Sequence, residues 1–540
     1  MDRTFFGRSL MLSLLKKRVI GLKDGYRQNI AVLGNQYSGK TSVLHHFMAN
    51  LDEPEVTCIN LDLENKDIHY FFNKLVGSLL YNFSKNCHLP LKEAMSELME
   101  VVRERIPQTV QVIRQIQKDI DKGKTYAAYL GLLTLPEVFT NETGHFCLVV
   151  LDEFQNLEDM FGPHAFRDLG KKIMTQKRCL YVVASSFPAL AERIINEKLS
   201  LLFGNFEAVH VDSFSYEESV RFIERNLEKT VLGSQLSSFL TDFTGGHPLY
   251  LDLLCRELYN LSAIHGQTEV YLPLLAQAVE NTLFDRWGVI SRHCELLIKD
   301  LYKGRENQWV GPLLISLANG HHKIETLMTD LKFTRYVLTQ RLNRLVDQAV
   351  VIRNGTSYFV KDKLFRYWIK YVYQKRLRDV EFSNDKQKQA FREEFQRAVD
   401  HFKVHSRQDF PARIADLLHC FNNDSFDLNG RKYRLPVFNR IEPAKLRSAN
   451  GTFMDSILAH SNEGTWLIAV KKENLMESDV ANFLSGAKEL TIKPKRCIFV
   501  SLTNLDEQAR LKALQERCWV WNERELNTLL TVFDKPFIIR

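Results

Sequence analysis

The chain has 540 residues, 45% of them hydrophobic and 25% charged, which excludes a disordered or fibrous protein and allows several globular domains. Its 72 Lys and Arg against 65 Asp and Glu give a net charge of +7, which permits contact with nucleic acid without requiring it. The amino-terminal stretch lacks the pattern of a signal peptide, and no apolar run approaches the ~18 residues of a membrane helix. Nine cysteines without paired metal-binding spacing predict reduced thiols and a cytoplasmic protein that does not contact a membrane.

The first motif follows an apolar run at Ile30–Leu33. It fits G-x-x-x-x-G-K-[ST], the pattern of a phosphate-binding loop between a strand and a helix. Its residues are Gly34, Asn35, Gln36, Tyr37, Ser38, Gly39, Lys40, Thr41 and Ser42. The glycines allow backbone N–H groups to turn toward a phosphate, and the helix N-terminus adds partial positive charge. Lys40 is expected to reach the β- and γ-phosphates and Thr41 to ligate Mg²⁺. The motif therefore predicts binding of ATP with Mg²⁺.

A second motif ends the apolar run Phe146–Leu151. A continuous apolar run is typical of a central parallel strand covered on both faces, and this one ends in Asp152 and Glu153. The carboxyl end of such a strand lies beside the phosphate loop, where Asp152 is expected to hold Mg²⁺ and Glu153 to act as general base. The pair predicts hydrolysis as well as binding.

The surrounding pattern alternates strands and helices. Further strands are predicted at Val56–Asp62, Leu180–Ala184 and Ala208–Val211, with a helical region over 69–138. This alternation indicates a parallel sheet over residues 1–214, the ATPase core. Ser215 begins a capping-box pattern, and helical periodicity then continues to about residue 285. We therefore expect a helical lid over residues 215–287.

Residues 288–375 predict a winged-helix domain. Three short helical patterns at 312–320, 323–332 and 334–348 precede apolar runs at 349–352 and 357–360, which are joined across Asn354-Gly355, a strong hairpin signal. The third helix carries the polar residues Arg335, Gln340, Arg341, Asn343 and Arg344. This helix is expected either to face double-stranded DNA or to form the solvated surface of a domain that contacts proteins. A helical linker is predicted over 376–430.

Residues 431–540 return to an α/β pattern. Strands at 454–458 and 466–471 form a predicted hairpin, followed by a helix, a strand at 497–500, another helix and a strand at 519–521. The whole chain is therefore expected to be α/β, with a parallel-sheet nucleotide domain, a helical lid, a winged helix and a second α/β domain.

Together these motifs resemble an archaeal-type ATPase family related to the AAA+ and STAND nucleoside triphosphatases. Members have an F-x-G-R-x-x-E-L box, a phosphate loop, an LDE strand end followed by Phe-Gln, a serine-ended strand and a G-x-P motif. Here the same order runs through Phe5–Arg8, Gly34–Ser42, Leu151–Gln155, Ser185-Ser186 and Gly246–Pro248, with Met11 in place of the Glu of the first box. The resemblance covers about residues 1–375.

The resemblance implies further roles. Ser185 or Ser186 would sense the γ-phosphate, and Pro248 would contact the nucleotide. Relatives often carry an arginine finger where this chain has Asn205, which cannot neutralise transition-state charge. Arg193 or a partner protein would then supply the cation, or hydrolysis would be slow.

The carboxy-terminal domain resembles the PD-(D/E)XK nucleases, whose restriction-endonuclease-like fold uses two carboxylates and a lysine around Mg²⁺. Asp455 fits the first acid and Lys471 the lysine, but Ala469 stands where the second acid belongs. One carboxylate holds a hard cation poorly, so the resemblance implies a degenerate site. Glu463 or Glu473 could supply a displaced acid.

Three hypotheses for function follow. The first is an ATP-driven molecular switch that couples nucleotide state to binding of DNA or a protein partner. The second is an ATP-gated, Mg²⁺-dependent nuclease. The third is a signal scaffold that forms homo-oligomers on binding nucleotide and hydrolyses it little.

Overall fold

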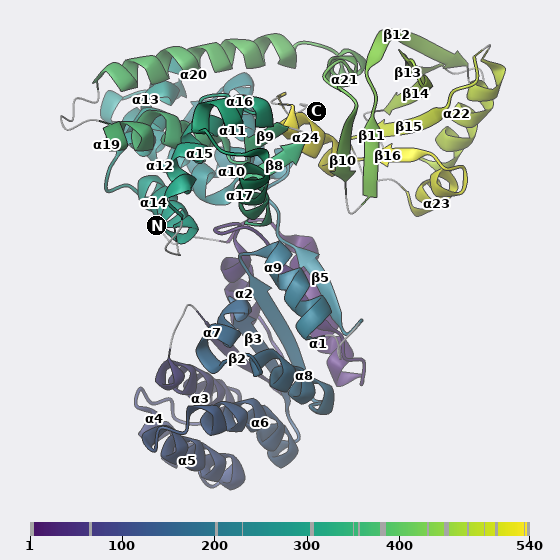
Figure 1. Ribbon diagram of the computed structural model, residues 1–540. Helices are drawn as coiled ribbons and strands as arrows, with labels where there is room; N and C mark the ends of the chain where they lie inside the picture. The colour runs from purple at the N-terminus through teal and green to yellow at the C-terminus, as the bar shows by residue number, and fades with distance from the viewer. Residues whose placement is uncertain are drawn as a thin grey trace. The chain divides into compact units, whose positions relative to one another are not determined.

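The structure of the protein is a computed structural model (Figure 1), which describes residues 5–63, 67–199, 204–228, 230–302, 307–348, 350–354, 357–378, 385–428, 431–447, 453–471, 475–490, 492–502, 506–533 and 535–536. The chain divides into two compact units. The first comprises residues 1–214 with His247–Leu249, and the second comprises residues 215–246 and 250–540. Each unit is described by itself below.

The first unit contains a five-stranded parallel sheet, as the sequence predicts. Its strands lie in the order β2-β3-β4-β1-β5. Their bounds are Asn29–Leu33 for β1, Val56–Asp62 for β2, Phe146–Asp152 for β3, Cys179–Ser185 for β4 and Phe206–His210 for β5. The three central strands β3, β4 and β1 are almost wholly buried, because helices cover both faces.

The two faces of this sheet have separate apolar cores. One face packs on α1 (Ser9–Lys23) and α2 (Lys40–Ala49). The other packs on the helices between β2 and β5, namely α3 (Ile68–Asn86), α4 (Met95–Val102), α5 (Pro107–Asp121), α6 (Thr125–Thr143), α7 (Leu157–Phe161), α8 (Ala165–Thr175) and α9 (Pro188–Arg193). Figure 1 shows α3 to α6 gathered into one helical group. Because all strands are parallel, their carboxyl ends meet at one edge, where the candidate site lies.

The second unit begins with helices, as expected for residues 215–287. These are α10 (Tyr216–Leu227), α11 (Ser234–Thr244), α12 (Pro248–His265, whose first two residues belong to the first unit) and α13 (Leu272–Phe284). Ser215 caps α10 through the predicted capping box with Glu218. A short parallel pair, β6 (Val231–Leu232) with β7 (Glu269–Val270), joins two loops of this region. The sequence pattern of this region predicts helices alone, so the strand pair is a difference from that prediction.

Residues 288–375 fold as helices followed by an antiparallel hairpin. The helices are α14 (Val289–Leu301), α15 (Val310–Ala318), α16 (Ile324–Leu331) and α17 (Arg335–Asp347), and the hairpin pairs β8 (Val351–Asn354) with β9 (Ser357–Val360). The predicted turn residues Gly355 and Thr356 lie outside the described residues. Ile352 of β8 packs against the core of the carboxy-terminal domain, so one face of the hairpin is covered by protein.

Further helices connect this region to the last domain. They are α18 (Lys363–Trp368), α19 (Gln374–Arg378), α20 (Asp385–Ser406) and α21 (Phe410–Leu418). α20 packs against α13, whose buried Glu280 forms ion pairs with Arg392 and Lys388. The predicted linker ends early, because its last residues form β10 (Asp424–Leu428), which pairs with β11 (Arg431–Leu435).

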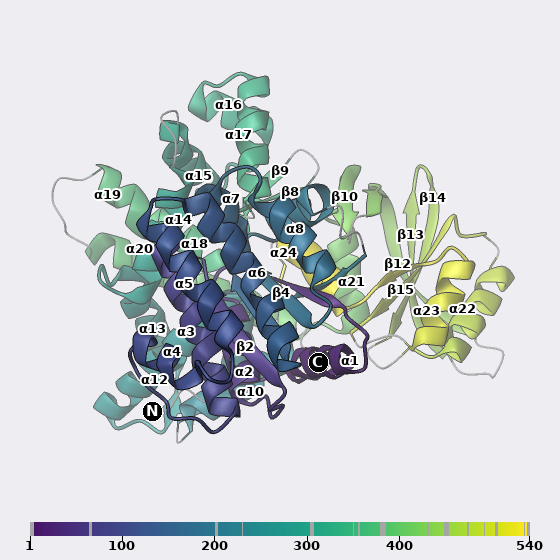
Figure 2. The same cartoon turned by 90° about the horizontal axis from the view of Figure 1, so that it is seen from below.

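The last domain is a mixed five-stranded sheet in the order β12-β13-β14-β15-β16. The strands are β12 (Phe438–Arg447), β13 (Phe453–Ser461), β14 (Gly464–Lys471), β15 (Arg496–Ser501) and β16 (Trp519–Trp521). The first three are antiparallel and the last three parallel. One face packs on α21 and α24 (Glu523–Val532), the other on α22 (Glu477–Glu489) and α23 (Glu507–Gln515), as Figure 2 shows. None of the described helices has the length and hydropathy of a membrane span.

Candidate functional site

The phosphate-loop pattern forms a turn between β1 and α2. Gly39 has φ of 96°, a left-handed conformation that favours glycine. At Gly34 a Cβ atom would lie 2.5 Å from the Val211 carbonyl oxygen and 2.7 Å from Ser38 Oγ. Only glycine therefore fits at Gly34. The Ser38 hydroxyl is buried and has no hydrogen-bond partner in the described part of the chain, as expected of a group that awaits a ligand.

Lys40 is buried at the start of α2. Its Nζ donates hydrogen bonds to the Asn35 carbonyl oxygen at 3.0 Å and to Ser186 Oγ at 2.9 Å. Burial lowers the pKa of Lys40, while the nearby carboxylates of Glu153 and Asp152 oppose that shift. A cation held in this way is poised to exchange neutral acceptors for phosphate oxygens.

Thr41 and Asp152 meet across the edge of the sheet. Thr41 Oγ1 donates a hydrogen bond of 2.5 Å to Asp152 Oδ2. Asp152 is 5% exposed, and burial raises the pKa of its carboxyl group above the usual value, although the Thr41 hydrogen bond acts in the opposite direction. A hydroxyl and a carboxylate in contact match the pair that a Mg²⁺ ion uses beside a phosphate loop.

Glu153 directly follows β3 in a left-handed conformation with φ of 52°. Its carboxylate accepts hydrogen bonds from the Ser186 hydroxyl, from the Ser186 backbone N–H at 3.0 Å and from Gln155 Nε2 at 2.7 Å. These donors fix the orientation of the carboxylate.

The two serines after β4 differ in their contacts. The Ser185 hydroxyl accepts a hydrogen bond from the Phe187 N–H at 3.1 Å, so it caps the local turn. The Ser186 hydroxyl contacts both Lys40 and Glu153. Of the pair that the sequence left open, Ser186 is therefore the one whose side chain lies among the phosphate-loop residues.

Two residues at this edge carry contacts that their sequence positions did not indicate. Gln155 holds Glu153 from two residues away. Arg8 donates to the carbonyl oxygens of Ser38, at 3.3 Å, and of Asp212, and its guanidinium lies 5.0 Å from the ring centroid of Phe214. Both residues belong to the family boxes quoted above, but that resemblance gave neither a role. Arg8 ties the phosphate loop to the segment after β5.

The remaining predicted residues of the first unit lie as follows. Ser42 is exposed in the first turn of α2, and Arg193 is exposed at the end of α9. The Asn205 carbonyl oxygen accepts a hydrogen bond from the Asn29 N–H. His247 Nε2 lies 3.3 Å from the Gln36 carbonyl oxygen, which puts the segment containing Pro248 near the phosphate loop.

The exposed face of α17 is smaller than its sequence indicated. Arg335 and Arg344 are exposed, and Gln340 donates to the exposed Tyr336 hydroxyl at 2.6 Å. Arg341 instead lies over the rings of Phe333 and Trp309, with Cζ at 4.1 Å and 5.2 Å from their centroids. Arg341 is therefore packed within the domain.

The nuclease-like residues of the last domain do not share a face. Ser456 pairs with Ala469 in the register of β13 and β14, so Asp455 points to the same face as Ile457, toward α21 and α24. Lys471 points to the opposite face, toward α22, where it forms an ion pair of 2.7 Å with Asp479. The expected pairing of Asp455 with Lys471 is wrong, because a step of one residue along a strand reverses the face.

The acids proposed as replacements do not restore this site. Glu463 forms ion pairs with Arg434 and Lys495, and Glu473 lies outside the described residues. No group of three or more His, Cys, Asp or Glu side chains that could hold a metal ion occurs in the part of the chain that the structure describes.

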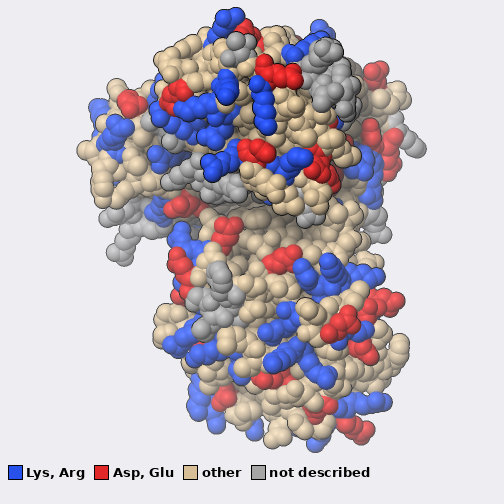
Figure 3. Space-filling model, turned by 90° about the vertical axis from the view of Figure 1, so that its right-hand side faces the viewer, with Lys and Arg blue, Asp and Glu red and all other residues tan. Residues whose placement is uncertain are grey.

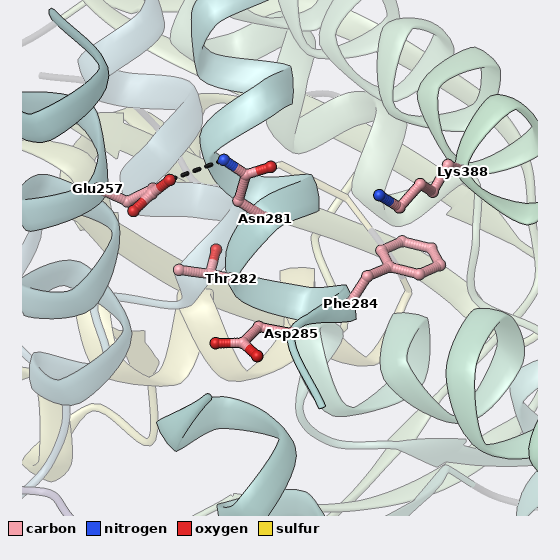
Figure 4. Close-up of a pocket in the computed structure, with 6 residues that line it drawn as sticks. All are labelled: Glu257, Asn281, Thr282, Phe284, Asp285 and Lys388. Atoms are coloured by element: carbon pink, nitrogen blue, oxygen red, sulfur yellow. Dashed lines mark hydrogen bonds between the residues drawn. The ribbon is translucent and has the colours of Figure 1, made fainter. Parts of the chain in front are cut away.

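A pocket in the second unit has a volume of about 380 Å³. Its lining side chains converge from α12, α13 and α20 (Figure 4), and Asn281 donates to Glu257 Oε1 at 2.7 Å. The pocket contains none of the residues singled out by the sequence. On the side of the molecule shown in Figure 3, Lys and Arg side chains are interspersed with Asp and Glu among the described residues.

Comparisons with known proteins place these features in context. No protein-family model matches the chain, and neither does any curated protein. Among solved structures, a Walker-type ATPase of Pyrococcus abyssi has a TM-score of 0.48 at 15% identity, over 68% of this chain and 97% of that one. The Aeropyrum pernix ORC2 protein has a TM-score of 0.45 at 13% identity, over 74% and 98%. The Thermotoga maritima RuvB Holliday junction branch migration motor has a TM-score of 0.34 at 12% identity, over 68% and 96%. Because these TM-scores are 0.48 or less and the identities are 15% or less, the function is inferred from the residues of the chain itself.

Proposed function

We propose that the protein binds ATP with Mg²⁺ and hydrolyses it as a molecular switch. The observation that carries this proposal is the hydrogen-bonded series Lys40–Ser186–Glu153 beside the contact between Thr41 and Asp152. Residues from the phosphate loop, β3 and β4 thereby meet at one edge of a parallel sheet, which is where a nucleoside triphosphate binds in such folds.

Each of these residues has a distinct role in the proposal. The loop from Gly34 to Gly39 presents backbone N–H groups to the phosphates, and Lys40 binds the β- and γ-phosphate oxygens. Thr41 and Asp152 would hold Mg²⁺, which neutralises charge that develops on the phosphates. Ser186 contacts the γ-phosphate, and Glu153 accepts the proton of the attacking water. Pro248 contacts the nucleotide from the segment beside Gln36.

The rate of hydrolysis depends on how Glu153 is released. Three hydrogen bonds hold its carboxylate, so the carboxylate must leave at least one of these donors before it can accept a proton from water. A γ-phosphate that binds Lys40 and Ser186 would compete for the Ser186 hydroxyl and thereby free Glu153. If Glu153 is released from Ser186 inefficiently, hydrolysis is slow. The same contacts then favour the second candidate function, a scaffold that forms homo-oligomers on binding nucleotide and hydrolyses it little.

The proposal includes a binding partner, either double-stranded DNA or another protein. Exposed Arg335 and Arg344 on α17 support contact with double-stranded DNA through the winged-helix region, while the packing of Ile352 against the last domain supports protein contact there instead. The nuclease hypothesis has no support from the geometry, because Asp455 and Lys471 point to opposite faces of their sheet.

Nucleotide binding and turnover provide the test. Titration calorimetry should detect ATP binding in the presence of Mg²⁺ for the wild type and none for Lys40→Ala, whereas Lys16→Ala, on the exposed side of α1, should bind as the wild type does. The ATPase rate is then measured without nucleic acid and with duplex DNA, single-stranded DNA or RNA. Unchanged ATP affinity in Lys40→Ala would contradict the assignment of the site.

A further inference from the structure

Two pairs of cysteines lie side by side on neighbouring parallel strands. Cys147 of β3 is directly opposite Cys179 of β4. In the last domain Ile498 of β15 is opposite Trp519 of β16, so the preceding residues, Cys497 and Cys518, are neighbours, and both belong to the apolar cluster under α22 and α23. Adjacent strands are ~4.8 Å apart, within the ~4.4–6.8 Å between Cα atoms that a disulfide spans. All four thiols are reduced.

The two pairs differ in access to solvent. Cys147 and Cys179 are each 0% exposed, beneath the helices of the first unit. Cys497 is partly exposed at the amino-terminal end of β15, while Cys518 is 5% exposed directly behind it. Of these four cysteines only Cys497 is partly exposed, so the second pair is the more accessible of the two to a small solute.

The chemistry of the second pair is asymmetric. The pKa of the Cys497 thiol is lowered, first by its hydrogen-bonding interaction with Cys518 and further by the nearby Arg496 guanidinium, while burial opposes the shift. The same hydrogen bond raises the pKa of Cys518. By contrast, burial raises the pKa of the three other partly exposed thiols, Cys58, Cys87 and Cys420. The thiolate is the nucleophilic form, so Cys497 is suited to attack and Cys518 to resolve.

We propose that Cys497 and Cys518 form a peroxide-reactive dithiol that closes to a reversible disulfide between β15 and β16. The Cys497 thiolate attacks one oxygen of a hydroperoxide; an S–O bond forms, the O–O bond breaks, and the leaving oxygen takes a proton to become water or an alcohol. The Cys518 sulfur then attacks the Cys497 sulfenic acid; the S–S bond forms, the S–O bond breaks, and the departing hydroxide takes the Cys518 proton as water. A dithiol reductant reverses the change.

The bond would fix an edge of the domain. β16 is the last strand of its sheet and pairs only with β15 among the described strands. A covalent link at Cys518, the residue before β16, removes freedom from the unfolded chain and holds α23, which connects the two strands, in place. The oxidised domain should therefore be the more stable one.

The test uses the full untagged chain exposed to a modest excess of hydrogen peroxide. Thiols are counted under denaturing conditions before and after, and the peptides are mapped by mass spectrometry without reduction. We expect two of the nine thiols to disappear and a Cys497–Cys518 peptide to appear, with full recovery on adding dithiothreitol. In Cys518→Ser, a dimedone adduct should accumulate on Cys497. Cys179→Ser, the matched variant from the buried pair, should behave as the wild type does.

Several outcomes would overturn the proposal. In the first, Cys497 and Cys518 of the wild type stay reduced while other cysteines react. In the second, the disulfide joins two chains. In the third, the Cys147 and Cys179 thiols are lost at the same rate as Cys497 and Cys518. The wild-type map decides the question even when a serine variant folds poorly.

Discussion

Ser186 connects the lysine of the phosphate loop with the carboxylate that follows β3. Its hydroxyl accepts a hydrogen bond from Lys40 and donates one to Glu153. A γ-phosphate would offer oxygen acceptors to both donors, so it would displace Glu153 from the hydroxyl. At the scale of single residues, the carboxylate of the proposed base, Glu153, is therefore oriented and held by hydrogen bonds in the structure.

Glu153→Gln tests this base. The substitution keeps the volume and a hydrogen-bonding carbonyl but removes the group that takes the proton, so turnover should fall by about 10²-fold or more while ATP remains bound. Steady-state ATPase rates and ATP titration by calorimetry measure the two quantities. Turnover within about twofold of the wild type would assign the base to another residue.

The variant Asp152→Asn tests how much folding stability is lost by burying the carboxylate of Asp152, the proposed metal ligand. Burial raises the pKa of the Asp152 carboxyl group in the folded protein above its ordinary value of 3.8. The contribution of the protonated carboxyl group to folding stability is therefore fully present below pH 3.8. It is lost as the pH rises through the folded-state pKa. At neutral pH the charged carboxylate therefore destabilises the free protein, and the neutral amide should raise Tm there. The Tm difference between variant and wild type should shrink in acid.

The same variant should lose the stabilisation that ATP with Mg²⁺ gives the wild type, because an amide is a poor ligand for a hard cation. Differential scanning fluorimetry over a pH series measures both effects. A lower Tm of the variant at neutral pH would mean that the Thr41 hydrogen bond outweighs the desolvation of the carboxylate.

At the scale of elements, α17 is divided by its own packing. Leu338, Leu342 and Leu345 are buried, and Arg341 covers aromatic rings next to them. Arg335 and Arg344 remain on the exposed side. The basic face available to a partner is therefore set by helix geometry and not by the number of arginines in the segment.

Replacing Arg335 and Arg344 together by Ala should weaken binding of duplex DNA, if α17 contacts it. Each lost phosphate contact should reduce the magnitude of the slope of log affinity against log salt by about 0.9. Fluorescence anisotropy with labelled duplex at several salt concentrations measures this slope. Arg397→Ala on α20, whose side chain is 77% exposed, is the matched control. An unchanged slope would assign α17 to protein contacts.

At the scale of the whole molecule, the two compact units have separate cores. The phosphate-loop segment, β3 and β4 all belong to the first unit, whereas residues 288–375 and the last domain belong to the second. A ligand that binds one folded unit stabilises that unit by mass action.

In differential scanning calorimetry, ATP with Mg²⁺ should therefore raise the unfolding temperature of one transition and leave that of the other unchanged. At a ligand concentration of about 100 times Kd the bound unit gains about 2.7 kcal/mol. Lys40→Ala should abolish the shift without changing the second transition. A single transition that moves as a whole would show that the units unfold together.

The parallel sheet and the phosphate loop could be predicted because their signals are local. A continuous apolar run marks a strand covered on both faces, and the loop needs its glycines, lysine and hydroxyl at consecutive positions. The strand β12 gave no such signal. Pro443 and charged residues interrupt its pattern, and the sheet tolerates the proline because β12 is an edge strand.

The sequence by itself thus determined which residues meet at the carboxyl edge of the first sheet. Lys40, Thr41, Asp152 and Glu153 come from two short motifs whose local geometry their own residues specify. Only the tertiary structure decided which of Ser185 and Ser186 points to Lys40, that Arg341 is packed, and that Asp455 and Lys471 are separated by their sheet. The physical reason is register: side chains alternate every residue along a strand, so the face of a residue depends on pairing between strands that are distant in sequence.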